Sequence, residues 1–153
     1  MFVNTTAVNL GNNNPHLLAY LRSTFNPVYY FGLSNEATKL VGGHGLNVGC
    51  VIPTLPQSLD SFNLRPLVVF IDFKIVPKEV ILNTGIFFQK YSPLLTIHVN
   101  CLSKEWDEII KYLETTHDYR IGDSLGDDYL LYRKDTESLY NKGVYRKYQE
   151  FIF

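Results

Sequence analysis

Apolar residues recur along this chain with two different spacings, and each spacing predicts a kind of element. Helical spacing runs over Pro15–Phe25, where Asn14 suits the N-cap and proline suits the first helical position. A second apolar stripe at helical spacing begins at Trp106, with Ser103 placed to cap it and acidic residues in its first turn. The pattern therefore predicts two amphipathic helices, one near the N-terminus and one over residues 103–115.

Runs rich in β-branched and aromatic residues predict the strands. Residues 80–90 fit either a helix or a strand, and Gly85 followed by an apolar run favours a hairpin arm. Residues 33–65 are irregular, with a short helix expected over Ser34–Val41. The expected strands are Val28–Phe31, Leu67–Val76, Leu94–Cys101, Tyr119–Ile121, Tyr129–Arg133 and Val144–Phe153.

This order of elements predicts the fold class. Runs of strands with two separate helices are typical of an α+β domain. We expect one domain over residues 1–153, with a mostly antiparallel sheet, two helices packed on one face and long loop or arm insertions. The predicted core consists of Val69, Ile71, Phe73, Ile97, Val99, Trp106, Ile109, Ile110 and Leu113.

Composition and charge narrow the function classes. The 153 residues are 46% hydrophobic and 14% aromatic, which excludes a disordered chain. The net charge of −1 gives none of the basic excess that a specific nucleic-acid binder needs. We expect no membrane contact, because no apolar run approaches about 20 residues, and no secretory signal at the N-terminus. Cys50 and Cys101 are expected to be buried thiols, with a disulfide between them left open.

Candidate chemistry is sparse. His44 and His98 could form the acid/base pair of a two-histidine phosphoesterase. That family needs a hydroxyl residue two positions after each histidine, where this chain has Leu46 and Asn100. The glycine-rich stretch 42–49 is expected to be a mobile loop, and whether it binds a ligand is left open. A turn is expected over the aspartate-rich residues 123–128, which include Asp123, Asp127 and Asp128. The sequence therefore predicts no catalytic, cofactor-binding or metal-binding residues and no cofactor.

Several segments together resemble phage tail completion proteins of the tail-terminator, or tail-to-head joining, type. The similar parts are Leu17–Leu21, Val28–Tyr30, Arg65–Phe70, Leu95–Cys101 running into Ser103–Trp106, and Asp135–Tyr140 before Val144–Phe153. The resemblance implies a structural virion protein and not an enzyme. Its subunits would form a ring, expected to be hexameric, that caps the tail tube and joins it to the neck.

The resemblance also implies partners and a location. The partners would be other copies of the chain, tail tube proteins and neck or connector proteins, in a virion assembled in the host cytoplasm. Residues 33–63 and 77–93 are expected to carry these contacts, because they hold apolar side chains that an isolated arm could not bury. A small phage-encoded binding or inhibitor module is the alternative. Ring stoichiometry, the neighbouring proteins, the host and the conformation of 77–93 stay open.

Overall fold

One seven-stranded sheet organises the chain. The computed structural model describes residues 6–11, 15–25, 27–32, 47–51, 59–73, 76, 78–90, 92–98, 104–125 and 128–134. The strands follow the spatial order β3-β2-β1-β4-β5-β7-β6. Their bounds are β1 Ala7–Leu10, β2 Val28–Gly32, β3 Asn47–Val51, β4 Val68–Asp72, β5 Leu94–His98, β6 Tyr119–Leu125 and β7 Asp128–Arg133.

The sheet is mostly parallel, so the prediction of a mostly antiparallel sheet is wrong. Strands β1 to β5 pair only in parallel with one another, and β7 alone runs against its neighbours β5 and β6. Two strands that the sequence pattern missed, β1 and β3, complete the parallel part of the sheet. The two short strands expected over 119–121 and 129–133 are present within β6 and β7, which form an antiparallel pair.

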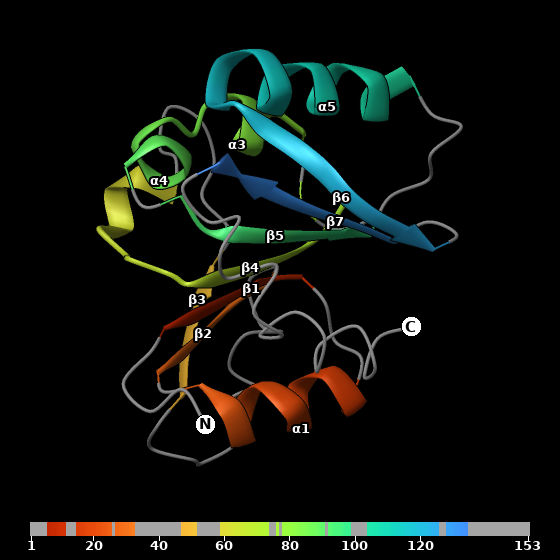
Figure 1. The fold of residues 1–153 in the computed structure, drawn as a ribbon. Helices are drawn as coiled ribbons and strands as arrows, with labels where there is room; N and C mark the ends of the chain where they lie inside the picture. The colour runs from red at the N-terminus through yellow and green to blue at the C-terminus, as the bar shows by residue number, and fades with distance from the viewer. Residues whose placement is uncertain are drawn as a thin grey trace.

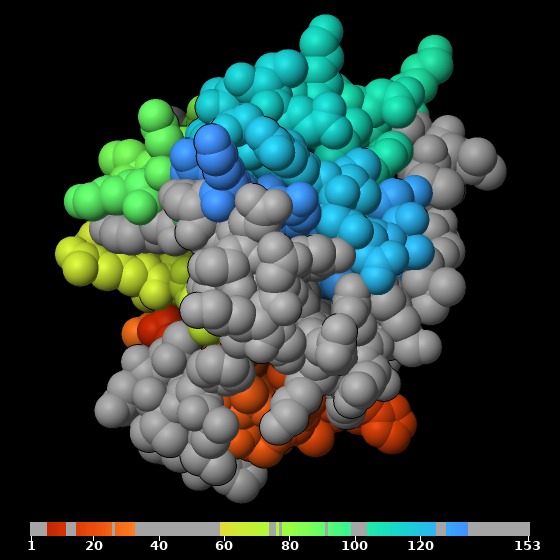
Figure 2. Space-filling model, in the orientation of Figure 1, coloured from red at the N-terminus to blue at the C-terminus, as the bar shows by residue number. Residues whose placement is uncertain are grey.

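Helices cover both faces of this sheet (Figure 1), which corrects the expectation that two helices share one face. Helix α1, Pro15–Thr24, packs on one face, against alternate residues of β1, β2 and β4. Helices α3 (Lys78–Leu82), α4 (Ile86–Gln89) and α5 (Lys104–His117) pack on the other face. Strand β6 follows α5 and lies beside it on the surface seen in Figure 2. The fold is therefore a doubly wound α/β sheet.

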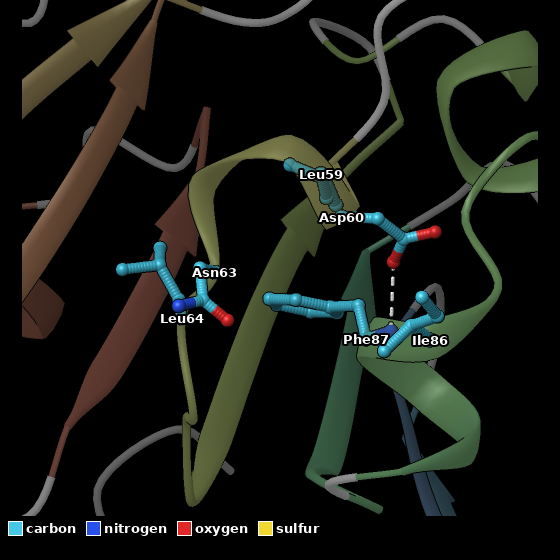
Figure 3. Close-up of a pocket in the computed structure, with 6 residues that line it drawn as sticks. All are labelled: Leu59, Asp60, Asn63, Leu64, Ile86 and Phe87. Carbon is cyan, nitrogen blue, oxygen red and sulfur yellow. Dashed lines mark hydrogen bonds between the residues drawn. The ribbon is translucent and has the colours of Figure 1, made fainter.

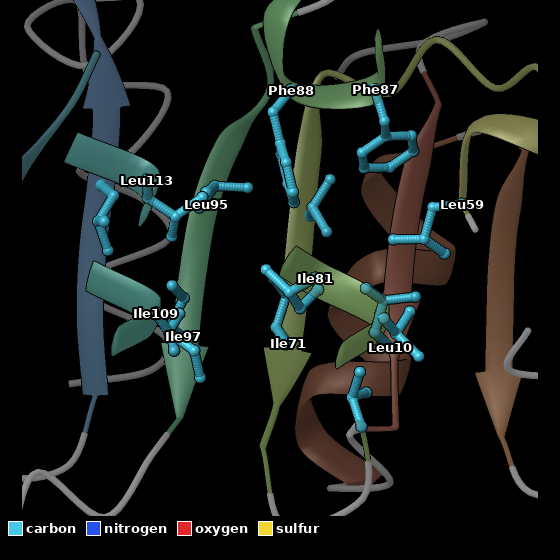
Figure 4. Packing of buried hydrophobic residues seen from close by; sticks show 14 of the residues in the cluster. Leu10, Leu59, Ile71, Ile81, Phe87, Phe88, Leu95, Ile97, Ile109 and Leu113 are labelled. Carbon is cyan, nitrogen blue, oxygen red and sulfur yellow. The ribbon is translucent and has the colours of Figure 1, made fainter. Parts of the chain in front are cut away.

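Most of the predicted core is confirmed. The buried members are Val69, Ile71, Ile97, Trp106, Ile109 and Leu113, which share one cluster on the α5 face (Figure 4). Phe73 and Ile110 are partly buried against it. Val99 lies outside the described residues, as do the predicted helix 34–41, the strand 144–153 and Cys101.

Residues 80–90 form helices and not a hairpin arm. The side chains Val80, Ile81, Phe87 and Phe88 of α3 and α4 belong to the core cluster on the α5 face and are at most 3% exposed. The prediction that this segment carries intermolecular contacts assumed that Ile81, Ile86, Phe87 and Phe88 could not be buried within one chain. That assumption is wrong for Ile81, Phe87 and Phe88, which fill the core of the chain itself, whereas Ile86 is 57% exposed.

A buried polar network fixes the end of α5. The Tyr112 hydroxyl donates to the Thr84 carbonyl at 2.7 Å, so it accepts from the Nε2–H of His117 at 2.9 Å. Nδ1 of His117 has no hydrogen-bond partner among the described residues. Burial, and then the nearby Arg133 guanidinium, lower the pKa of His117 below its ordinary value of 6.5. The folded chain therefore holds this imidazole neutral.

We expect this histidine to make stability fall in mild acid. Because the pKa of His117 is lower in the folded chain than in the unfolded one, the unfolded chain takes up the proton first as pH drops. The stability that the neutral His117 side chain contributes is complete above its pKa in the unfolded chain, about 6.5. It is lost as pH falls towards the pKa of His117 in the folded chain. Urea unfolding at pH 7.5 and 5.5 should show this fall in the wild type and a smaller one in His117→Gln. An equal fall in both proteins would contradict this assignment.

Candidate functional site

The carboxyl ends of the parallel strands meet at one edge of the sheet. From β1 the chain moves outward through β2 to β3, and then returns to β4 and moves the other way to β5. The order reverses between β1 and β4, and α1 and α3 leave from this edge to opposite faces. In open α/β sheets, ligands bind at such a reversal, outside the carboxyl ends of the strands. We call the described residues at these strand ends the carboxyl edge.

Gly11 ends β1 at this reversal. Its φ of 86° lies in the left-handed region, where a side chain would be strained. Its backbone N–H donates to the Phe31 carbonyl at 2.8 Å and so ties the end of β1 to β2. A glycine here therefore lets the chain turn sharply at the end of β1.

Three ionisable side chains continue the edge on neighbouring strands. Asp72 ends β4 and pairs in register with His98, the last residue of β5. His98 pairs in turn with Asp128, the first residue of β7. Because register partners point to the same side of a sheet, the three side chains lie on one face. It is the α1 face, since Phe70 and Leu130, two residues from Asp72 and Asp128, pack with α1.

His98 and Asp128 are in direct contact. The Nδ1 atom of His98 lies 2.8 Å from Oδ1 of Asp128, and the two side chains are 31% and 30% exposed. A carboxylate only accepts hydrogen bonds, so Nδ1 of His98 carries the proton in this pair. Nε2, the atom that would act as a base, makes no hydrogen bond within the described part of the chain. The pair therefore presents an oriented imidazole to solvent at the carboxyl edge.

A separate small hollow lies beside α4 (Figure 3). Its cavity volume is about 20 Å³, far below the roughly 300–1,000 Å³ of ligand pockets, and Leu59, Asn63 and Ile86 are among its lining residues. The Asp60 carboxylate beside it accepts hydrogen bonds from the backbone N–H groups of Gly85 and Phe87, at 2.9 and 2.7 Å. Asp60 thus satisfies the first N–H groups of α4, and we assign this hollow no ligand.

The sequence predictions included two residues of the carboxyl edge, His98 and Asp128, but assigned them to other features. His98 was paired with His44, which lies outside the described residues, and Asp128 was expected in a turn with Asp123 and Asp127. Asp123 instead lies within β6, and Asp127 is not described. Asp72 and Gly11 were missed as site residues. The signal that could have found them is a polar or glycine residue directly after a buried apolar run.

Metal-binding groups and membrane-spanning helices are both absent from the described residues. No group of three or more histidine, cysteine or carboxylate side chains among them can hold a metal ion. None of the described helices has the length and apolar character needed to cross a membrane. The side chain of Cys50 and all of Cys101 lie outside this description, so neither thiol is placed.

The sequence matches no family model and no curated protein sequence. Its fold, in contrast, is similar to that of methyltransferase FkbM from Methylobacillus flagellatus KT, with a TM-score of 0.62 and 14% identity. The similarity covers 86% of this chain and 44% of that protein, so the chain spans less than half of FkbM's length. The two proteins therefore share the doubly wound sheet.

Two other methyltransferases are more distantly similar. An rRNA methylase from Streptococcus thermophilus has 12% identity and a TM-score of 0.48, over 84% of each chain. The precorrin-6y C5,15-methyltransferase from Geobacter metallireducens GS-15 has 12% identity and a TM-score of 0.49, over 86% of this chain and 80% of that one. These two likenesses are too weak to define the fold.

The fold corrects the functional expectations from the sequence. The resemblance to phage tail terminators is wrong, and so is the structural virion role that it implied. The binding or inhibitor module and the two-histidine phosphoesterase of His44 and His98 are also wrong, since the fold matches a methyltransferase. The expectation of a protein that is not an enzyme is corrected on the same finding. Ring partners, tail tube and neck contacts, and a virion location are untested by the fold of one chain.

Proposed function

We propose that this chain is the cofactor-binding region of a methyltransferase that uses S-adenosylmethionine as its methyl donor. The observation that carries the proposal is the fold likeness to FkbM methyltransferase, which extends over 86% of the chain. The sheet order adds support, because its reversal between β1 and β4 is where doubly wound folds bind nucleotide-containing cofactors. When bound, the cofactor supplies an electrophilic methyl group on a positively charged sulfur.

Two residues of the carboxyl edge suit such a cofactor. Gly11 has no side chain and a left-handed φ, so the main chain can approach a ligand closely. Asp72 brings a carboxylate to the neighbouring strand end, where a cation such as the amino group of the cofactor can pair with it. Related folds place a ribose-binding carboxylate near the end of β2. Here Gly32 ends β2 and the next carboxylate in the sequence, Glu36, lies outside the described residues.

The first test is cofactor binding by the whole chain. We expect S-adenosylhomocysteine, the product form of the cofactor, to bind the wild type in calorimetry. Gly11→Val should weaken this binding at least tenfold, because a β-branched residue is strained at a φ of 86° and would distort the main chain at the end of β1. The tenfold change corresponds to about 1.4 kcal/mol.

Gly85→Ala is the matched control for this test. A methyl group added at Gly85 would meet only the Asp60 carboxylate, at 3.8 Å, and the backbone there is not left-handed. We expect this variant to bind S-adenosylhomocysteine like the wild type. No binding by the wild type, or equal binding by a folded Gly11→Val, would contradict the proposed function.

A further inference from the structure

The contact between His98 and Asp128 is arranged as an oriented base. Asp128 holds Nδ1 of the imidazole at 2.8 Å, and Nε2 is the remaining nitrogen with a lone pair. A base that is oriented by a third group is a recurrent arrangement where a nucleophile must lose a proton. Both side chains are about 30% exposed, so an acceptor molecule can reach the imidazole.

The position of this pair fits a second substrate. In the sheet, β4 lies between β1 and β5, and neighbouring strands are about 4.8 Å apart. His98 on β5 is therefore about 10 Å across the sheet from the end of β1, two strand spacings away. A cofactor over the β1–β4 reversal would leave the end of β5 available to the molecule that receives the methyl group.

We infer that His98 is the general base for methyl transfer to a hydroxyl group, and that Asp128 positions its imidazole. This inference rests on the proposed function. The acceptor oxygen forms a bond to the methyl carbon as the bond from carbon to sulfur breaks, and the sulfur keeps the electron pair and becomes a neutral thioether. The hydroxyl proton passes to Nε2 of His98 and then to solvent.

A base such as His98 at the carboxyl edge favours a hydroxyl group as the methyl acceptor. A hydroxyl is a weak nucleophile until a base removes its proton, whereas a carboxylate is already ionised at neutral pH.

The experiment compares two simple acceptors that differ in their need for a base. Phenol is protonated at pH 8.5, since its pKa is about 10, whereas 4-nitrophenol is largely ionised there. With radiolabelled S-adenosylmethionine, we expect the wild type to methylate both. His98→Gln should slow transfer to phenol roughly 10²–10⁴-fold and leave transfer to 4-nitrophenol within about threefold. S-adenosylhomocysteine should bind the variant like the wild type.

Two variants complete the design. Asp128→Ala should slow transfer to phenol less than His98→Gln does, and nitrogen NMR of the His98 ring should show the proton moving from Nδ1 towards Nε2. Glu108→Ala is the control, because it removes a carboxylate as Asp128→Ala does, here from an exposed ion pair with Lys78 on the other face. It should leave both rates unchanged.

Three other results would each contradict a different part of this inference. Equal loss with both acceptors in His98→Gln would show that the residue only positions the acceptor. A wild type that binds S-adenosylhomocysteine but methylates neither probe would refute the hydroxyl acceptor while leaving the proposed function intact. Failure to bind S-adenosylhomocysteine would remove the proposed function and the inference with it.

Discussion

Replacing Phe88 by alanine should lower the free energy of unfolding by about 3–5 kcal/mol, the range for a fully buried phenylalanine. Phe88 lies on α4, is completely buried, and packs edge-on against the rings of Phe87 and Tyr119. Removing its ring leaves a cavity that the surrounding sheet and α5 cannot fill. Urea unfolding followed by fluorescence measures the change.

Ile86→Ala in the same short helix is the control for Phe88→Ala. Ile86 is 57% exposed, so we expect a change within about 0.5 kcal/mol. The comparison tests whether 86–89 belongs to the core or projects as an arm. Similar small effects at both positions would contradict the packing described here.

Replacing Arg133 by methionine should lower the free energy of unfolding by about 2–3 kcal/mol, because several hydrogen bonds from a charged donor to partly buried acceptors are lost together. Nη1 of Arg133 donates to the backbone carbonyls of Phe88 and Gln89 and to Oγ of Ser92, the first and last at 2.9 and 2.8 Å. The guanidinium thus joins the end of β7 to the connection between α4 and β5. Methionine keeps most of the apolar stem but leaves these acceptors without their donor.

Two comparisons sharpen the Arg133 prediction. Arg133→Lys should recover part of the stability, since an ammonium can satisfy some of the same acceptors. Arg120→Met, at an exposed position of β6, should change the free energy of unfolding by less than about 0.5 kcal/mol. An Arg133→Met protein as stable as the wild type would refute the assigned role.

The helix predictions succeeded where one apolar stripe was long enough to show its period. Helix α5 has fourteen residues with alternating buried and exposed faces, and α1 has ten. Helices α3 and α4 have only five and four residues, and their adjacent apolar pairs look like parts of a strand. A segment that short cannot reveal a 3.6-residue period, so tertiary packing decides its structure.

The fold class was wrong because its parallel strands give weak sequence signals. Strand β1 has four residues, all of them buried, so it shows no alternation between apolar and polar positions. Strand β3, Asn47–Val51, contains a glycine and lies in a stretch rich in glycine. Without these two strands, the remaining order of elements is typical of an α+β domain.

The candidate site could be predicted only in fragments. Residues Asp72, His98 and Asp128 are separated by 26 and 30 positions in the sequence, and strand register alone brings them into one row. The sequence shows that each flanks an apolar run, but not that β7 inserts beside β5 in antiparallel direction. That insertion places a carboxylate next to His98, so the pair follows from topology and not from any local motif.

Amide chemical-shift mapping with S-adenosylhomocysteine tests the central claim most directly. A ¹H–¹⁵N spectrum of the whole chain should show the largest shifts at the carboxyl edge, at Gly11 and Asp72 above all, with smaller ones at His98. The amides of Lys90 and Ser92, before β5 at the opposite end of the strands, should hardly move. Shifts concentrated at that opposite end, or no shifts at saturating ligand, would contradict a cofactor site at the carboxyl edge.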